Sequence, residues 1–159
     1  MSSHRLPRLS AVLAAAALLT VTGCTGSDAR ATVAVPRPSE QETSLCRALH
    51  AALPKTVAGL ERSDPEPDSE LTAGWGDAAI VLRCGVPRPE RMSDPQADSV
   101  DAGRDVQWLL EKRAGEGPRF TTVLRKAYVE VTLDERFAHD VAPLVDLAGP
   151  VARTVPKGP

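Results

Sequence analysis

The sequence is poor in aromatic residues, in cysteine and in histidine. Aromatics make up 3% of its 159 residues, including two tryptophans, and it has three cysteines and three histidines. Aliphatic side chains must therefore fill the interior, and each tryptophan is expected to have a structural role. An excess of positive charge is also missing, since the formal net charge is −2. Binding to DNA or RNA is disfavoured, because it requires clustered lysine and arginine.

The signatures of common enzyme and metal sites are missing too. Neither His50 nor His139 accompanies a Gly-x-Ser-x-Gly turn, which disfavours a Ser-His-Asp hydrolase. The glycines within 115–118 lead into proline, with no lysine after them, unlike a phosphate-binding loop. One acidic run imitates calcium ligands but has prolines between them and no glycine at a sharp turn: Asp64, Glu66, Asp68 and Glu70. We therefore predict no catalytic residues, no metal site and no cofactor.

The N-terminus carries a signal for export. Arg5 and Arg8 precede an apolar run that is too short to cross about 30 Å of hydrocarbon comfortably. This run ends in Val21-Thr22-Gly23-Cys24, which looks like a bacterial lipobox. Residues 1–23 are therefore expected to be a cleaved signal peptide and Cys24 the lipidated residue. The alternative is a secretory signal whose cleavage site happens to precede a cysteine.

Lipidation of Cys24 implies a location. A cysteine carrying diacylglycerol, with fatty acids such as palmitate, has at least two acyl chains and anchors stably in a bilayer. We expect the protein on the extracytoplasmic face of the cell membrane, held by the lipid alone because its net charge is negative. Residues 24–41 are small, polar or proline and predict a flexible tether.

Cys46 and Cys84 then remain as an even pair in an oxidising compartment, which favours a disulfide. Ser39 and Glu42 form a capping-box pattern that begins a helix running to Pro54, with Cys46 on its apolar face. Alternation over 78–86 predicts a strand with Cys84 facing inward. A bond between the two would join this helix to this strand. The alternative is two buried free thiols.

The remaining patterns predict one α+β domain over 42–153, with a tail at 154–159. A strand is expected at 106–110, and strong β signals cover 120–133, as one strand or as a hairpin turning near Arg125. A helix is expected over 139–152, ended or kinked by Pro150. This order of elements indicates an antiparallel sheet with two helices packed on one face and one disulfide.

Several of these segments together resemble one family. The chain is similar to the DUF3515 family of actinobacterial proteins, many of them predicted lipoproteins. The resemblance covers roughly 45–151 and rests on Cys46–Leu49, Trp75–Asp77, Ile80–Val86, Val106–Trp108, Phe120–Thr122 and Tyr128–Val131. It implies a cell-envelope domain with paired cysteines and no assigned activity, so no catalytic residues are carried over.

One group of residues is a candidate ligand groove. Trp75 beside a Gly-Asp turn at Asp77 would form an aromatic floor for a peptide or glycan, with Arg83 or Arg125 pairing a carboxylate. The structural alternative is that Trp75 fills the core, Asp77 turns a hairpin and Arg83 lines the open face of the sheet.

Three functional hypotheses remain. The first is a non-catalytic binding or assembly module of the cell envelope, with an envelope protein or the cell wall as partner. The second is an enzyme acting on peptidoglycan or its precursors through Asp77 and Arg83. The third is a structural spacer, which predicts no ordered patch on the exposed face of the sheet.

Overall fold

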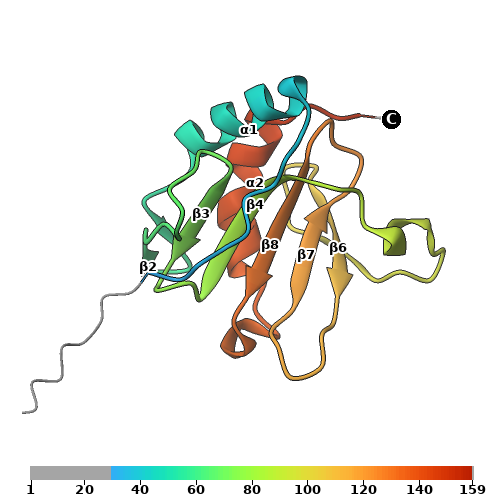
Figure 1. The fold of residues 1–159 in the computed structure, drawn as a ribbon. Coiled ribbons are helices and arrows are strands. Elements are labelled where there is room, and N and C mark those ends of the chain that lie inside the picture. The colour runs from blue at the N-terminus through green and yellow to red at the C-terminus, as the bar shows by residue number, and fades with distance from the viewer. Residues whose placement is uncertain (1–29, 159) are drawn as a thin grey trace, which may run out of the picture.

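The computed structural model describes residues 30–158, so the predicted signal peptide and Cys24 lie outside the described residues. Those residues form an α+β fold with one six-stranded antiparallel sheet, a two-stranded sheet and two α-helices (Figure 1). The strand order in the large sheet is β3-β4-β8-β7-β6-β5. The elements are α1 (Glu40–Ala52), β1 (Thr56–Val57), β2 (Leu60–Glu61), β3 (Thr72–Trp75), β4 (Ile80–Val86), η1 (Glu90–Ser93), β5 (Ser99–Asp101), β6 (Gln107–Glu111), β7 (Arg119–Thr122), β8 (Tyr128–Leu133), η2 (Glu135–Phe137) and α2 (Ala142–Thr154).

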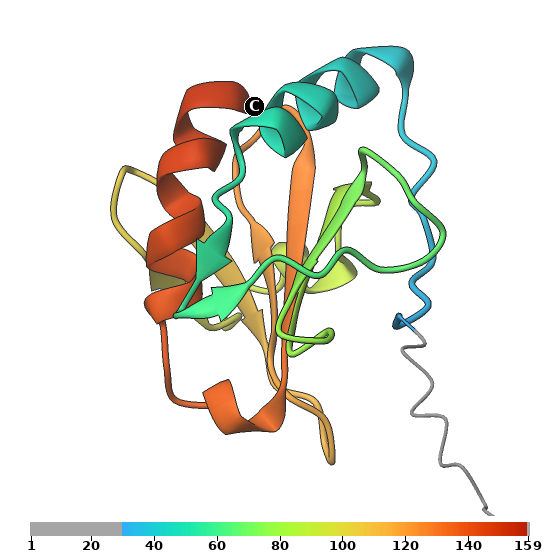
Figure 2. The ribbon, with the colours of Figure 1, turned by 90° about the vertical axis from the view of Figure 1, so that its left-hand side faces the viewer.

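Both α-helices lie on one face of the large sheet, and the views in Figures 1 and 2 agree on this arrangement. The core between helices and sheet is mainly aliphatic, as the shortage of aromatics predicts, and Trp75 and Trp108 are its largest fully buried side chains. Among residues 30–158, no α-helix lies on the other face. It is the open face of the sheet, and the segment before α1 crosses it. The predicted fold class is therefore confirmed.

Helix α1 begins as the capping box predicts. The Ser39 hydroxyl accepts a hydrogen bond from the backbone N–H of Glu42 at 3.3 Å, and the Glu42 carboxylate accepts from the backbone N–H of Ser39 at 2.9 Å. These bonds satisfy two N–H groups that a helix start otherwise leaves unpaired.

Replacing Ser39 with alanine is expected to lower the free energy of unfolding by about 1 kcal/mol, because the N-cap acceptor is lost. Chemical denaturation of the S39A variant measures this change. The Ser39→Asp variant, which keeps an acceptor at the N-cap, is the control and should stay close to the unchanged protein. Equal losses in both variants would contradict a capping role.

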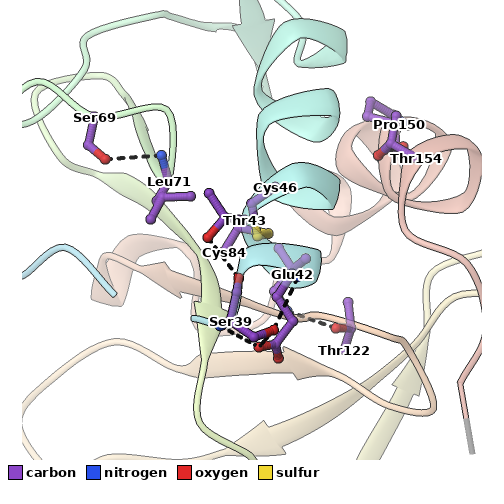
Figure 3. The surroundings of a disulfide bond; sticks show 11 residues. Ser39, Glu42, Thr43, Cys46, Ser69, Leu71, Cys84, Thr122, Pro150 and Thr154 are labelled. Carbon is purple, nitrogen blue, oxygen red and sulfur yellow. Dashed lines mark hydrogen bonds between the residues drawn. A yellow bond between two sulfur atoms is a disulfide. The ribbon is translucent and has the colours of Figure 1, made fainter. Parts of the chain in front are cut away.

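The disulfide joins α1 to β4, as predicted (Figure 3). Cys46 is buried on the inner face of α1, and Cys84 is buried on the inner face of β4. Their Cα atoms lie 5.5 Å apart, within the range that a disulfide bridges. The bond therefore ties the first helix to the second strand of the large sheet.

The β signal over 120–133 is a hairpin, not one long strand. Strands β7 and β8 pair antiparallel across a loop at 123–127. Arg125 holds this loop: its side chain is 6% exposed and donates to the carbonyl oxygens of Asp105 and Val155 at 2.5 and 3.0 Å. Leu124 has a positive φ of 54°. The sequence left this choice open because the turn depends on tertiary contacts.

Two expectations about the end of the chain are corrected. Helix α2 begins at Ala142, later than predicted, and continues past Pro150 to Thr154. The predicted tail also lies against the domain. Val155 is fully buried, and the N–H of Gly158 donates to the carbonyl oxygen of Leu124 at 3.0 Å. Backbone hydrogen bonds to the β7–β8 loop thus hold a segment whose composition alone looks unstructured.

The predicted tether is also shorter than 24–41, because its described part lies against the domain. The N–H of Val33 donates to the carbonyl oxygen of Glu66 at 2.8 Å. The side chain of Arg83 donates through Nε to the carbonyl oxygen of Ala34 at 2.9 Å. Pro36 is buried, and Pro38 lies against Gly85, where an added Cβ would come within 2.6 Å of it. We call residues 30–38 the N-terminal strap.

Segment 87–103 contains Pro87, Pro89 and Pro95 and still forms short regular elements. The 3-10 helix η1 and strand β5 lie within it, and β5 pairs with β6 at the edge of the sheet. Partner strand β6 supplies the hydrogen bonds that this short strand cannot provide locally. Across residues 30–158, no helix combines the length and the apolar character that crossing a membrane requires.

Candidate functional site

The four residues of the predicted groove do not come together. Trp75 is fully buried in the core, where its ring N–H donates to the carbonyl oxygen of Pro54 at 3.2 Å. Arg83 lies on the open face of the sheet, two residues after the half-buried Val81 on the same side of β4, and its neighbour Leu82 is buried in the core. Successive strand residues face opposite sides of a sheet, which separates Trp75 from Arg83. Trp75 is therefore a core residue in this fold.

The other two residues lie at opposite ends of the sheet. Asp77 is in the β3–β4 turn with a φ of 53°, and its carboxylate accepts a hydrogen bond from the Ser63 hydroxyl at 3.3 Å. Arg125 is in the β7–β8 loop, beside the far end of β4. Asp77 and Arg83 thus form no acid–base pair. The Nη1 and Nη2 groups of Arg125 donate to backbone carbonyl oxygens.

The acidic loop is neutralised by arginines. Arg62 pairs with Asp64 at 2.5 Å, Arg47 pairs with Glu70 at 3.1 Å, and Arg30 contacts both remaining carboxylates, Glu66 and Asp68. Carboxylates held in this way do not converge on one point. Among residues 30–158, no group of three His, Cys, Asp or Glu side chains is arranged to hold a metal ion.

A hollow of about 550 Å³ lies between α1 and the acidic loop and contains His50. The Arg62 guanidinium lies 2.9 Å from Nε2 of His50 and stacks on the Trp75 ring, 5.3 Å from its centroid. Because arginine only donates, Nε2 accepts and the proton of a neutral His50 is on Nδ1. The Thr43 hydroxyl in this hollow donates to the Ser39 carbonyl oxygen at 2.8 Å. The arrangement ties the loop to α1 and forms no nucleophile–base pair.

The open face of the sheet carries two arginine–carboxylate pairs. Arg83 on β4 pairs with Glu130 on β8 at 3.0 Å, directly across the strands. Arg119 on β7 binds Glu111 on β6 through two parallel hydrogen bonds of 2.9 and 3.0 Å. The hydrogen bonding with Glu111 raises the pKa of Arg119 above its usual value, so its guanidinium is charged at neutral pH.

These pairs border a hollow of about 280 Å³, which we call the open-face hollow. The N-terminal strap forms one wall of the hollow and the strands form its floor. Its lining is Thr32, Val33, Ala34, Val81, Arg83, Arg113, Arg119, Glu130 and Thr132. Arg113 is held at the rim by two hydrogen bonds to the carbonyl oxygen of Gly117, at 3.0 and 2.8 Å, and by an ion pair with Glu116.

Sequence reasoning identified one residue of this hollow, Arg83, and placed it correctly on the outward side of its strand. Arg119 and Glu130 were missed as a group because they belong to separate strands. The available signal was alternation: Tyr128, Glu130 and Thr132 alternate with apolar residues in 128–133, and Gln107 and Glu111 lie on the matching side of 107–111, which marks one polar face. The register that brings these strands together is a tertiary property.

Comparison with known proteins identifies a family. The model of a protein family described as "Protein of unknown function (DUF3515)" matches residues 6–159. No curated protein and no solved structure matches the chain.

Proposed function

The chain belongs to the DUF3515 family, and we propose that it is a lipid-anchored, extracytoplasmic binding or assembly module of the cell envelope, with the open face of the sheet as its binding surface. The observation that carries the proposal is the open-face hollow, with an ordered set of charged side chains on a sheet face that neither α1 nor α2 covers. The lipobox at Val21–Cys24 and the Cys46–Cys84 disulfide support an extracytoplasmic location.

The strap links the proposed anchor to this surface. About eight residues separate Cys24 from Thr32 in the wall of the hollow, so that a fully extended chain reaches roughly 29 Å at most. An anchor at Cys24 would therefore hold the open face within a short distance of the membrane. This reach is shorter than a free tether over 24–41 would allow.

The alternatives gain less support from the same residues. A spacer predicts no ordered patch on the open face, whereas the Arg83–Glu130 and Arg119–Glu111 pairs form one. An enzyme acting on peptidoglycan through Asp77 and Arg83 needs these side chains together, but Asp77 lies in a turn and bonds to Ser63. The binding module therefore accounts best for the residues on the open face.

Anchoring is tested by the Cys24→Ser variant expressed in its native cells. We expect the unchanged protein to take up labelled palmitate and to fractionate with membranes, and the C24S variant to lose both properties. Ser10→Ala, in the same leader but away from the lipobox, is the control. Equal membrane association of all three proteins, with no label, would refute lipid anchoring.

The binding surface is tested by photo-crosslinking in the native envelope. A crosslinking amino acid replaces Val81 in the open-face hollow or, as a control, Val145, which is 52% exposed on α2. We expect the Val81 position to give a discrete crosslinked product and the Val145 position to give none. Products from Val145 alone would move the binding surface to the helical face.

A further inference from the structure

The open-face hollow has the chemistry of an anion site, an inference that rests on the proposed function and names its ligand class. We propose that the hollow binds an oxyanion, a carboxylate or phosphate group, between the guanidinium groups of Arg83 and Arg119 and the hydroxyl of Thr132. Arginine suits such a ligand because its fixed N–H donors match paired oxygens.

Both arginines keep a donor group beyond the bonds that orient them. Arg83 uses Nε for the Ala34 carbonyl oxygen and Nη1 for Glu130, and within residues 30–158 its Nη2 has no partner. Arg119 uses Nε and Nη2 for Glu111, and its Nη1 has no partner in the same range. The existing bonds fix each guanidinium, so that a ligand meets pre-oriented donors.

The sheet places these donors around Thr132. Strand β8 lies between β4 and β7, and Thr132 pairs with Arg119 on one side and with Val81 on the other. Strands β4 and β7 are therefore about 10 Å apart, twice the usual strand spacing. Arg83 is held toward β8 by Glu130 and Arg119 is held by Glu111 on β6, and both side chains line the same hollow as Thr132.

The charges are layered so that the positive groups face solvent. The Arg83 side chain is 28% exposed and its partner Glu130 10% exposed. The same order holds for Arg119 at 36% and Glu111 at 14%. An incoming anion meets guanidinium groups first, with the carboxylates beneath them. Partly desolvated positions of this kind strengthen the interaction relative to an exposed ion pair.

The size of the hollow limits the ligand. A volume of about 280 Å³ is at the lower end for a complete small-molecule pocket. It accommodates a terminal carboxylate or a phosphate with its nearest atoms. The remainder of a larger ligand would extend along the open face beside the strap.

The test uses the full chain in nonionic detergent at low salt, titrated with inorganic phosphate and separately with acetate. The side-chain Nε–H signals of Arg83 and Arg119 are followed by NMR. We expect saturable shifts of both signals with at least one of the two anions, while the signal of Arg91, in an exposed pair with Asp94, stays unchanged. Absence of shifts with either anion, or equal shifts at Arg91, overturns the proposal.

Two variants separate the site from general charge effects. Thr132→Val keeps the β-branched shape and is expected to weaken anion binding about tenfold. The paired change Arg119→Gln with Glu111→Gln removes both charges together and is expected to abolish binding. The matched control, Arg91→Gln with Asp94→Asn, also removes one exposed ion pair and should bind normally. Unchanged affinity in T132V and in the paired variant, with thermal unfolding showing that both are folded, rejects the site.

The source of the oxyanion is determined by sedimenting the unanchored C24S variant with lipid vesicles. Sedimentation with phosphatidylglycerol vesicles but not phosphatidylcholine vesicles, lost in the paired variant, assigns a lipid headgroup. Binding of free anions without sedimentation assigns a soluble or cell-wall ligand. Both outcomes support an oxyanion site. If no anion bound, the result of the palmitate experiment on Cys24 would still stand by itself.

Discussion

Loss of the Cys46–Cys84 disulfide is expected to lower the free energy of unfolding by about 4 kcal/mol, the value for closing a loop with a sequence separation of 38. The bond limits the freedom of the unfolded chain and holds α1 against β4 in the folded one. The paired Cys46→Ala, Cys84→Ala variant, measured by chemical denaturation, gives the change directly. Its midpoint of thermal unfolding should fall by at least about 10 °C.

The unchanged protein with and without reductant is the matched comparison. Reductant should lower the free energy of unfolding of the unchanged protein by a similar amount. It should not change the free energy of unfolding of the doubly substituted variant. A doubly substituted variant as stable as the oxidised protein would contradict the role of the bond.

Replacing Gly117 with alanine is expected to cost about 3 kcal/mol or more. An added Cβ would lie 1.8 Å from the carbonyl oxygen of Leu133, which is backbone at the end of β8 and has no room to rotate away. The Gly117 carbonyl oxygen also accepts both hydrogen bonds from Arg113, so the rim of the open-face hollow would move with it. Chemical denaturation measures the loss of stability.

Gly149→Ala is the control for the Gly117 change. Its Cβ would meet only the flexible end of Arg153, at 3.3 Å, within α2. Alanine favours a helix over glycine, so this variant is expected to gain up to about 1 kcal/mol. Similar losses of unfolding free energy in both variants would show that the contact between an added Cβ and Leu133 does not cause the destabilisation.

Local patterns predicted those parts of the fold that depend on neighbours in sequence. The Ser39–Glu42 capping box set the start of α1, and alternation in β4 set which side chains face inward, including Cys84. Hydrophobic periodicity is a local signal, and these elements follow it. The antiparallel sheet with two helices on one face followed from their order.

Contacts between distant segments were beyond such patterns. The strap and the C-terminal tail have polar or proline-rich composition, yet Glu66 and Leu124 bind them through backbone carbonyl groups. Strand β5 needs β6 as a partner, and the turn near Arg125 needs the carbonyl oxygens of Asp105 and Val155. Backbone hydrogen bonds to remote segments leave little trace in composition.

The aliphatic core, the capped first helix and the inward-facing cysteines could be predicted from the sequence, because each depends on residue type and spacing within one element. The roles of the charged residues depend on the packing of the whole domain. This packing buries Trp75 away from Arg83 and brings Arg83 and Arg119 to the walls of one hollow. The physical reason is strand register, which joins residues far apart in the chain and is set by the packing of the whole sheet.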